Sequence, residues 1–235
     1  MVTNKTSLLA ASAFFALTES ILGFLLQTAP GEAVRILSYT SVVIACLFCT
    51  LFCERSKSYA FTQLGLICTV CADYFLVLAE KRQQLPAMLL FSVTQLAYFA
   101  RLYFADGNKK RRTWHLICRG LASAIVILLT LLVLGDGADA VALVSMFYYV
   151  NLLTNIVFAC LQRERSHVFV IGLLLFVCCD TLIGLSCLDA YLAIPEDSFI
   201  WSIIHPGFDL AWAFYVPSQT LLALSLLPER LKKCQ

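Results

Sequence analysis

Eight long apolar segments, separated by short polar clusters, make up most of this chain. Each segment is about 20 residues long, which is the length that an α-helix needs to cross the hydrocarbon core of a bilayer. Strands of a membrane barrel would instead alternate apolar and polar positions over about 10 residues, and the chain lacks that alternation. The pattern predicts an all-α, polytopic membrane protein with about eight transmembrane helices. We expect these helices over residues 7–27, 34–53, 59–79, 85–104, 114–134, 138–161, 167–188 and 203–226.

The composition agrees with this prediction. Of the 235 residues, 60% are hydrophobic and only 14% are charged. Soluble domains average roughly 45–50% apolar and about 25% charged residues. Because no linker, low-complexity tract or soluble domain interrupts the segments, we expect a single transmembrane domain over residues 1–235.

The basic residues fall mainly on one side of the predicted membrane. When the loops are followed from the N-terminus, one side receives only Arg35, Lys81 and Arg82. The other side receives Lys5, Arg55, Lys57, Lys109, Lys110, Arg111, Arg112, Arg163, Arg165, Arg230, Lys232 and Lys233. Loops rich in Lys and Arg stay cytoplasmic, so we expect a multi-pass protein with both termini in the cytoplasm. In a prokaryote its membrane would be the plasma membrane. We interpret the run Lys109–Arg112 as a loop that sets this topology, and we expect no nucleic-acid partner.

Two of the apolar segments carry an aspartate in the same local setting. The segments Gly65–Asp73 and Gly172–Asp180 have Gly, Leu, Val, Cys and Asp at the same offsets. An ionisable group deep in a membrane costs several kcal/mol, so it needs a functional or structural reason to be there. Asp73 and Asp180 are therefore the strongest candidates for functional residues.

The same similarity indicates an internal repeat. The two segments lie four spans apart, so both helices run in the same direction, and Ser92–Leu96 weakly resembles Val216–Thr220 in the spans that follow them. This pattern is compatible with two parallel four-helix halves, residues 1–112 and 113–235, with a site at their interface. Chance similarity in so apolar a chain is the alternative.

Both aspartates are expected at one depth in the membrane. Each lies 14 residues beyond the point where its helix enters the membrane from the cytoplasmic side, near Tyr59 and near Ser166. That places both roughly 21 Å into a core of roughly 30 Å. Polar side chains of other spans come near this level. We expect the following residues to line a common substrate-binding pocket with the aspartates: Glu19, Gln95, Tyr98, Tyr148, Asn151, Asp209, Tyr215 and Gln219.

A pair of carboxylates at this depth has a defined chemistry. Two carboxylates close together in a medium of low dielectric constant cannot both stay ionised, so one keeps a proton. A neutral acid beside an ionised base is the arrangement that general acid–base catalysis uses. The same pair could instead bind a cation or relay protons in a transporter.

Several of the polar residues also have a purely structural interpretation. Asp209 would lie in the first turn of the last span, where an acid suits the helix dipole. Gln95 and Gln219 could form hydrogen bonds between helices, and Glu19 could be a structural partner of a neighbouring helix. We expect Arg101, near the cytoplasmic end of its span, to extend its guanidinium toward the interface.

The sequence predicts neither a metal site nor a cofactor. Cys68 and Cys71 form a CxxC motif, but no His and no second CxxC stands near enough to complete a zinc site. Motifs of metalloproteases, nucleotide-binding loops and serine hydrolases are absent from the chain. The order Asp73-Tyr74, and the two cysteines before Asp180, also differ from the motifs of intramembrane aspartyl proteases.

Three stretches of the chain carry a resemblance to a known family: Gly65–Leu76, Leu173–Ile183 and Phe214–Leu222. Together they resemble the YhhN-like lysoplasmalogenase family of eight-span membrane proteins. The family has Gly before the first aspartate and Ser before the second, where this chain has Ala72 and Cys179. The family also carries a His in the span after the first aspartate, and this chain has Gln95 there.

The resemblance implies a membrane-embedded hydrolase that cleaves the vinyl ether bond of lysoplasmalogens. Asp73 and Asp180 would be its acid–base pair, and its partners would be a lysophospholipid or another single-chain amphiphile, together with membrane lipids. Gln95 cannot shuttle a proton near neutral pH as a His can, so a non-catalytic or altered member that binds an amphiphile is one alternative. A small proton-coupled transporter is the other.

Overall fold

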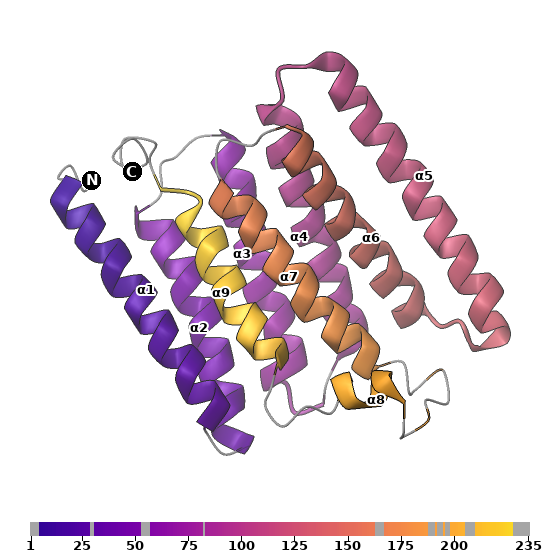
Figure 1. Cartoon of the computed structure of the whole chain (residues 1–235), viewed down its shortest axis with the longest axis horizontal. Coiled ribbons are helices and arrows are strands. Elements are labelled where there is room, and N and C mark those ends of the chain that lie inside the picture. Colours follow the sequence, from indigo (N-terminus) through magenta and orange to yellow (C-terminus); the bar gives the residue numbers. More distant parts are fainter. Residues whose placement is uncertain are drawn as a thin grey trace.

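The computed structural model of the chain describes residues 5–28, 31–52, 57–81, 83–162, 167–187, 191, 195, 198–204 and 210–227. All regular structure in these residues is helical (Figure 1). The helices are α1 (Lys5–Thr28), α2 (Gly31–Phe52), α3 (Lys57–Asp73), η1 (Tyr74–Leu78), α4 (Gln84–Ala105), α5 (Lys109–Leu134), η2 (Gly135–Gly137), α6 (Ala140–Leu161), α7 (His167–Ser186), α8 (Phe199–Ile204) and α9 (Leu210–Leu224).

The predicted all-α, polytopic membrane architecture is confirmed. In the described part of the chain, seven helical segments are long and apolar enough to cross a membrane. They comprise α1, α2, α3 with η1, α4, α5 with η2, α6 and α7. A shorter apolar helix, α9, follows them with 15 residues. At 1.5 Å per residue, α9 is roughly 22 Å long, less than the core of about 30 Å.

The last span, expected over 203–226, corresponds to the end of α8 and to α9, and residues 205–209 between them lie outside the described residues. One other expectation is wrong. The basic run Lys109–Arg112, expected in a loop, forms the first turn of α5. The side chain of Asn108 accepts a hydrogen bond from the Arg111 backbone N–H at 3.2 Å, and this cap allows the helix to begin before its apolar part.

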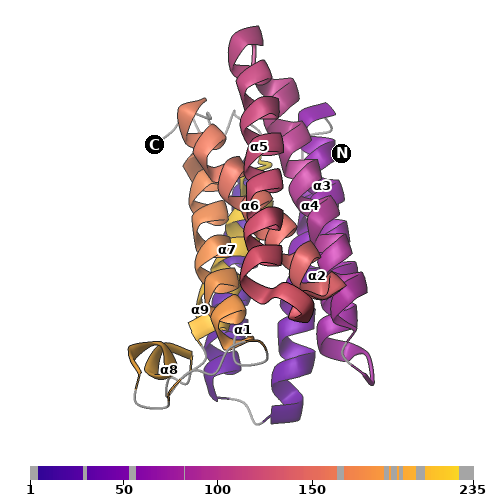
Figure 2. The same cartoon turned by 90° about the vertical axis from the view of Figure 1, so that its right-hand side faces the viewer.

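The helices form a bundle in which α9 is an inner element and α5 an outer one. α9 packs against α7 and also against α1, α2 and α3, whereas α5 packs chiefly on α6. α5 therefore lies at one edge of the bundle, and the short helix α8 lies beside one end of α7 (Figures 1 and 2). The start of α1 and the end of α9 lie at the same end of the bundle (Figure 1).

The pairs α3–α4 and α7–α9 make similar contacts. Thr94 Oγ1 on α4 donates a hydrogen bond to the carbonyl of Gly65 on α3 at 3.1 Å. Ser218 Oγ on α9 donates to the carbonyl of Gly172 on α7 at 2.9 Å. These residues occupy matching positions in the two similar stretches of sequence. The division into two parallel halves stays a prediction.

Gly65 lets α3 and α4 approach closely, and its replacement is expected to destabilise the bundle. A β-carbon at this position would lie 2.4 Å from Cε1 of Tyr98, a fully buried ring. We expect Gly65→Ala to lower the free energy of unfolding by about 1–3 kcal/mol because of overpacking. Thermal unfolding in detergent measures the effect. Gly120→Ala, where a β-carbon meets nothing within 4 Å, is the matched control. Equal melting temperatures for the two variants would contradict the close approach.

Candidate acid–base site

Asp73 lies where α3 passes into a π-helical turn. The α-helix ends at Asp73, and η1 begins at Tyr74 with the wider π geometry. Such π-helical turns are rare and occur frequently at functional sites. The Asp73 side chain is buried with 4% of its surface exposed. Tyr215 on α9 donates a hydrogen bond from its hydroxyl to Asp73 Oδ2 at 2.5 Å. A residue distant in sequence therefore holds this carboxyl group.

Asp180 has an equivalent partner on another helix. It lies in the second half of α7, and its Oδ2 accepts a hydrogen bond from the hydroxyl of Tyr148 on α6. Tyr148 is buried, whereas Asp180 keeps part of its surface accessible. Its neighbour Thr181 is exposed and bonds the Tyr149 hydroxyl at 2.7 Å. Each aspartate thus forms a tyrosine–carboxyl pair, and Asp180 is the more accessible of the two.

A row of aromatic rings joins the two tyrosine–carboxyl pairs. The ring of Phe91 on α4 lies 5.5 Å from that of Tyr148 and 6.2 Å from that of Phe176 on α7. The Phe176 ring in turn lies 5.9 Å from that of Tyr215. The structure therefore brings the two aspartates, which lie on different helices, into one region enclosed by aromatic side chains.

A buried polar network lies on the same face of α6 as Tyr148. Asn155 donates from Nδ2 to Gln95 Oε1 at 3.0 Å and to the Gln95 carbonyl at 2.9 Å. Arg119 on α5 donates from Nη1 to Asn151 Oδ1 and from Nη2 to Asn155 Oδ1. Two of the expected site residues, Gln95 and Asn151, are therefore joined through Arg119 and Asn155. No hydrogen bond links this network to Asp73 or Asp180 in the described part of the chain.

Two other expected site residues are buried polar groups without a hydrogen-bond partner among the described residues. Both the oxygen and the nitrogen of the Gln219 amide are unpaired, and the side chain is fully buried. Gln219 lies four residues after Tyr215, so the two share one face of α9. The hydroxyl of Tyr98 is likewise buried and unpaired, and its ring packs edge-on against Phe169 at 5.7 Å. Unpaired polar atoms are rare in protein interiors and require an explanation.

Of the remaining two expected site residues, Glu19 forms no hydrogen bond with the aspartates, and Asp209 cannot be placed. Glu19 on α1 is buried, and its Oε2 accepts a hydrogen bond from the hydroxyl of Ser41 on α2. No hydrogen bond joins Glu19 to either aspartate within the described residues, so its pairing with Ser41 fits the structural interpretation. Asp209 lies outside the described residues.

Arg119 and Asn155 are polar residues of this region that the sequence pattern did not predict, and Arg101 lies elsewhere than expected. Arg119 lies inside the span expected over 114–134, so its charge was itself a signal, and Asn155 lies one helical turn after Asn151. Arg101 does not extend toward the interface, because only 2% of its surface is exposed. Its Nη1 donates to hydroxyl oxygens on α3 and on the segment after α9, and its guanidinium lies 3.8 Å from the centroid of the Phe169 ring.

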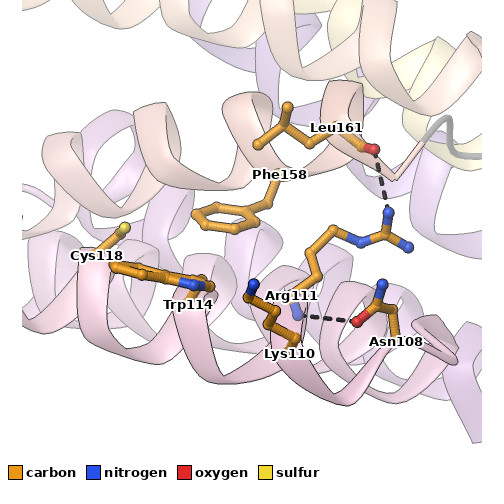
Figure 3. A pocket seen from close by; sticks show the side chains of 7 residues that line it. All are labelled: Asn108, Lys110, Arg111, Trp114, Cys118, Phe158 and Leu161. Atoms are coloured by element: carbon orange, nitrogen blue, oxygen red, sulfur yellow. Dashed lines mark hydrogen bonds between the residues drawn. The ribbon is translucent and has the colours of Figure 1, made fainter.

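A groove of about 360 Å³ opens at the end of the bundle where α5 begins (Figure 3). Its lining is Asn108, Lys110, Arg111, Trp114, Cys118, Phe158 and Leu161. Leu161 lies 13 residues beyond Tyr148 on α6, from 148 to 161, which corresponds to roughly 20 Å along the helix axis. The groove is therefore separate from the tyrosine–carboxyl pairs.

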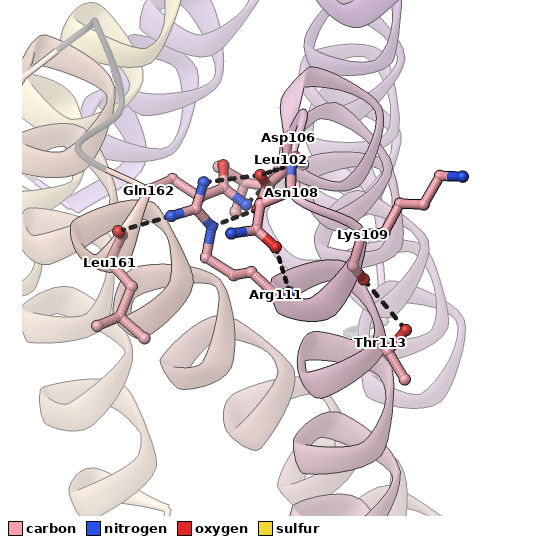
Figure 4. Close-up of polar contacts among 8 residues, drawn as sticks. All are labelled: Leu102, Asp106, Asn108, Lys109, Arg111, Thr113, Leu161 and Gln162. Carbon is pink, nitrogen blue, oxygen red and sulfur yellow. Dashed lines mark hydrogen bonds and ion pairs between the residues drawn. The ribbon is translucent and has the colours of Figure 1, made fainter.

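An ion pair fixes the turn between α4 and α5 at this end (Figure 4). Arg111 donates from Nε and Nη2 to the two oxygens of Asp106 at 2.5 and 2.7 Å. The Asn108 backbone N–H also donates to Asp106 Oδ1, at 2.8 Å. The hydrogen bonds of the Arg111 guanidinium lower the pKa of the Asp106 carboxyl below its usual range.

The Asp106–Arg111 pair is expected to stabilise the protein in a pH-dependent manner. Because the pKa of Asp106 is lower in the folded than in the unfolded protein, the contribution is complete above the unfolded-state pKa. It is lost as the pH falls through the folded-state pKa. We expect Asp106→Asn to lower the free energy of unfolding at pH 7 by about 1–3 kcal/mol. Thermal unfolding at pH 7 and at lower pH measures this effect. The difference in melting temperature between Asp106→Asn and the wild type should become smaller as the pH falls. A difference that does not change with pH would contradict the ion pair.

A comparison of the sequence with protein families gives one match. The sequence model of the YhhN family matches residues 34–226. No curated protein and no solved structure matches the chain. The matched range contains both aspartates, both tyrosine partners and the network around Arg119, and it excludes Glu19. The family resemblance inferred from sequence motifs is therefore confirmed.

Proposed function

Since the chain belongs to the YhhN family, we propose that it hydrolyses the vinyl ether bond of lysoplasmalogens within the membrane. The observation that carries this proposal is the pair of aspartates, each held by a tyrosine and joined by a row of aromatic rings. General acid–base catalysis requires one carboxyl group that gives a proton and one that accepts a proton. Asp73 and Asp180 would supply this pair, and the rings of Phe91 and Phe176 lie between their tyrosine partners.

The proposed reaction proceeds through an oxocarbenium ion. A protonated aspartate gives its proton to the vinyl carbon that is remote from the ether oxygen, and the positive charge then lies on the C–O unit. The ionised aspartate stabilises this cation and removes a proton from the attacking water. Two carboxyl groups serve a similar transition state in glycoside hydrolysis. The resulting hemiacetal collapses to a fatty aldehyde and a glycerophospho-base.

The tyrosines and Gln219 would position the reacting groups. Each tyrosine hydroxyl engages Oδ2 of its aspartate, so we propose that the other carboxyl oxygen exchanges the proton. The unpaired amide of Gln219 lies one turn from Tyr215 and can both donate and accept hydrogen bonds. We propose that it holds the attacking water, because buried water occupies sites with several polar partners.

We propose that the alkenyl chain reaches the site from the bilayer, between α6 and α7. Asp180 keeps part of its surface accessible, and the adjacent Tyr149–Thr181 contact is exposed on the same pair of helices. A substrate with one long apolar chain is dissolved in the membrane, so a lateral approach spares it transfer through water. The partners of the protein would then be a lysophospholipid, or another single-chain amphiphile, and the membrane lipids around it.

Release of aldehyde by the purified protein tests the proposed reaction. The protein in detergent or in vesicles is supplied with a lysoplasmalogen, and the fatty aldehyde is quantified over time. A lysophospholipid that carries an ester in place of the vinyl ether is the control, since its hydrolysis yields a fatty acid and no aldehyde. Failure of the folded wild type to release aldehyde would contradict the proposal. Proton-coupled uptake of a solute into vesicles would instead support the transporter alternative.

Gln95, which stands where the family has a His, is the reason to consider a non-catalytic or altered family member. Gln95 Oε1 accepts a hydrogen bond from Asn155 at 3.0 Å, and no hydrogen bond joins Gln95 to Asp73 or Asp180 within the described residues. In the proposed mechanism the two aspartates carry every proton transfer, so a His at this position is not required. An inactive wild type that binds lysophospholipid would favour the alternative.

We also propose that both termini face the cytoplasm. The basic first turn of α5 lies at the same end of the bundle as the start of α1 and the end of α9 (Figure 1). Segments rich in Lys and Arg stay on the cytoplasmic side of a membrane. Labelling of tags at the two termini with an impermeant reagent in intact cells tests this orientation, and labelling of either tag would contradict it.

A further inference from the structure

Arg119 is a buried cation within a membrane-spanning helix. Only 7% of its surface is exposed, and its guanidinium is enclosed by α4, α5 and α6. It lies 4.4 Å from the centroid of the Phe99 ring, and its Nη atoms donate to the side-chain oxygens of Asn151 and Asn155. Arg remains protonated in proteins, so the site carries a full positive charge.

No anion in the described part of the chain balances this charge. The partners of Arg119 are two neutral amides and the ring of His115, whose Nε2 lies 3.4 Å from Nη2. No carboxylate lies within ion-pair distance of the guanidinium among the described residues. Charged side chains inside a membrane are rare and mark substrate or ion sites, and they normally pair with an opposite charge. Arg119 therefore has no counter-ion among the described residues. A bound anionic ligand would supply one.

The unpaired atoms of this network are hydrogen-bond donors. Nε of Arg119 and Nε2 of Gln95 are buried donors without a partner among the described residues. Arg119 can only donate, so His115 must accept at Nε2, and in the neutral ring its unpaired Nδ1 then carries the hydrogen. Three buried donors around one positive charge are complementary to an anion that has several acceptor oxygens.

The location of the network relative to the aspartates identifies this anion. Tyr148, which holds Asp180, shares one face of α6 with Asn151 and Asn155. Along the helix axis, Asn151 and Asn155 lie roughly 4.5 and 10 Å from Tyr148. In a lysoplasmalogen, a three-carbon glycerol unit separates the vinyl ether from the phosphate, which is a comparable span. We propose that Arg119, with the Gln95 amide and the His115 ring N–H, binds the phosphate group of the substrate. This inference rests on the proposed vinyl ether hydrolysis.

Two vinyl ether substrates that differ only in the phosphate test the inference. The wild type should cleave a lysoplasmalogen with a lower KM than a 1-alkenylglycerol, which has the same alkenyl chain and no phosphate. Arg119→Gln should raise KM for the lysoplasmalogen by about 10- to 100-fold, because it removes a hydrogen-bonded charge. It should leave kcat/KM for the alkenylglycerol unchanged. If Arg119→Gln lowered kcat/KM equally for both substrates, the role of Arg119 would be merely structural and the proposal would be overturned.

Binding measurements separate this inference from the proposed reaction. A saturated alkyl lysophospholipid has no vinyl ether and cannot be hydrolysed, so its dissociation constant does not depend on catalysis. The wild type should bind it about 10- to 100-fold more tightly than the matching alkylglycerol. Arg112→Gln, which removes a charge stacked on Tyr103 near the start of the same helix, should keep this preference. Absence of the preference in the wild type would overturn the inference even if Arg119→Gln failed to fold. Absence of aldehyde release, with the preference present, would overturn only the proposed reaction.

Discussion

Replacement of Asp73 or Asp180 by asparagine is expected to lower kcat for aldehyde release by about 10²–10⁴-fold. Asparagine keeps the size of the side chain and can still accept a hydrogen bond from Tyr215 or Tyr148, but it can neither give nor take a proton at the vinyl ether. The loss should therefore appear in kcat, whereas binding of a saturated alkyl lysophospholipid should change little. Initial rates at saturating lysoplasmalogen measure the effect.

Asp136→Asn is the matched control for these two variants. Asp136 lies in η2, outside the α-helices of the bundle, and its side chain is exposed. Its replacement should leave the rate unchanged. The double variant, Asp73→Asn with Asp180→Asn, should be little slower than either single variant, because groups that act as a unit are not additive. A folded Asp73→Asn protein with full activity would remove the basis for the acid–base pair.

Replacement of Tyr215 or Tyr148 by phenylalanine is expected to lower kcat by about 10- to 100-fold. Each change removes the hydroxyl that donates to an aspartate Oδ2 and leaves the aromatic ring, so the row through Phe91 and Phe176 is preserved. The carboxyl group then lacks the contact that orients it, and proton transfer depends strongly on position.

Tyr149→Phe offers a close comparison with Tyr148→Phe. Tyr149 is the next residue on α6, and its hydroxyl bonds the exposed Thr181 rather than an aspartate. Its replacement should therefore leave kcat near that of the wild type. If the variants at 148 and 149 were equally active, the tyrosine–carboxyl pairs would have no part in the reaction.

Much of the fold follows from sequence pattern alone. Apolar length marks the membrane-spanning helices, because backbone polar groups in lipid must be satisfied within the segment itself. The expected start of α5 was wrong for a local reason. The start depends on capping near the interface, where apolar length carries no signal.

The candidate site is partly predictable from the sequence. A carboxylate in an apolar span is conspicuous among its neighbours, so the sequence alone singles out Asp73 and Asp180. Arg119 carries the same kind of signal in the fifth span, and the structure places it in the centre of a polar network. The depth estimate also included Glu19, which pairs with Ser41 instead.

The sequence by itself determined the helical membrane architecture and the family, and it predicted an approximate depth for each polar residue, because the rise per residue of an α-helix is constant. Only the tertiary structure decided which residues of equal depth meet. Depth is a coordinate along the helix axis, whereas contact also depends on the rotation of each helix and on its neighbours. That rotation comes from packing, as where α9 brings Tyr215 to Asp73 and α6 brings Tyr148 to Asp180.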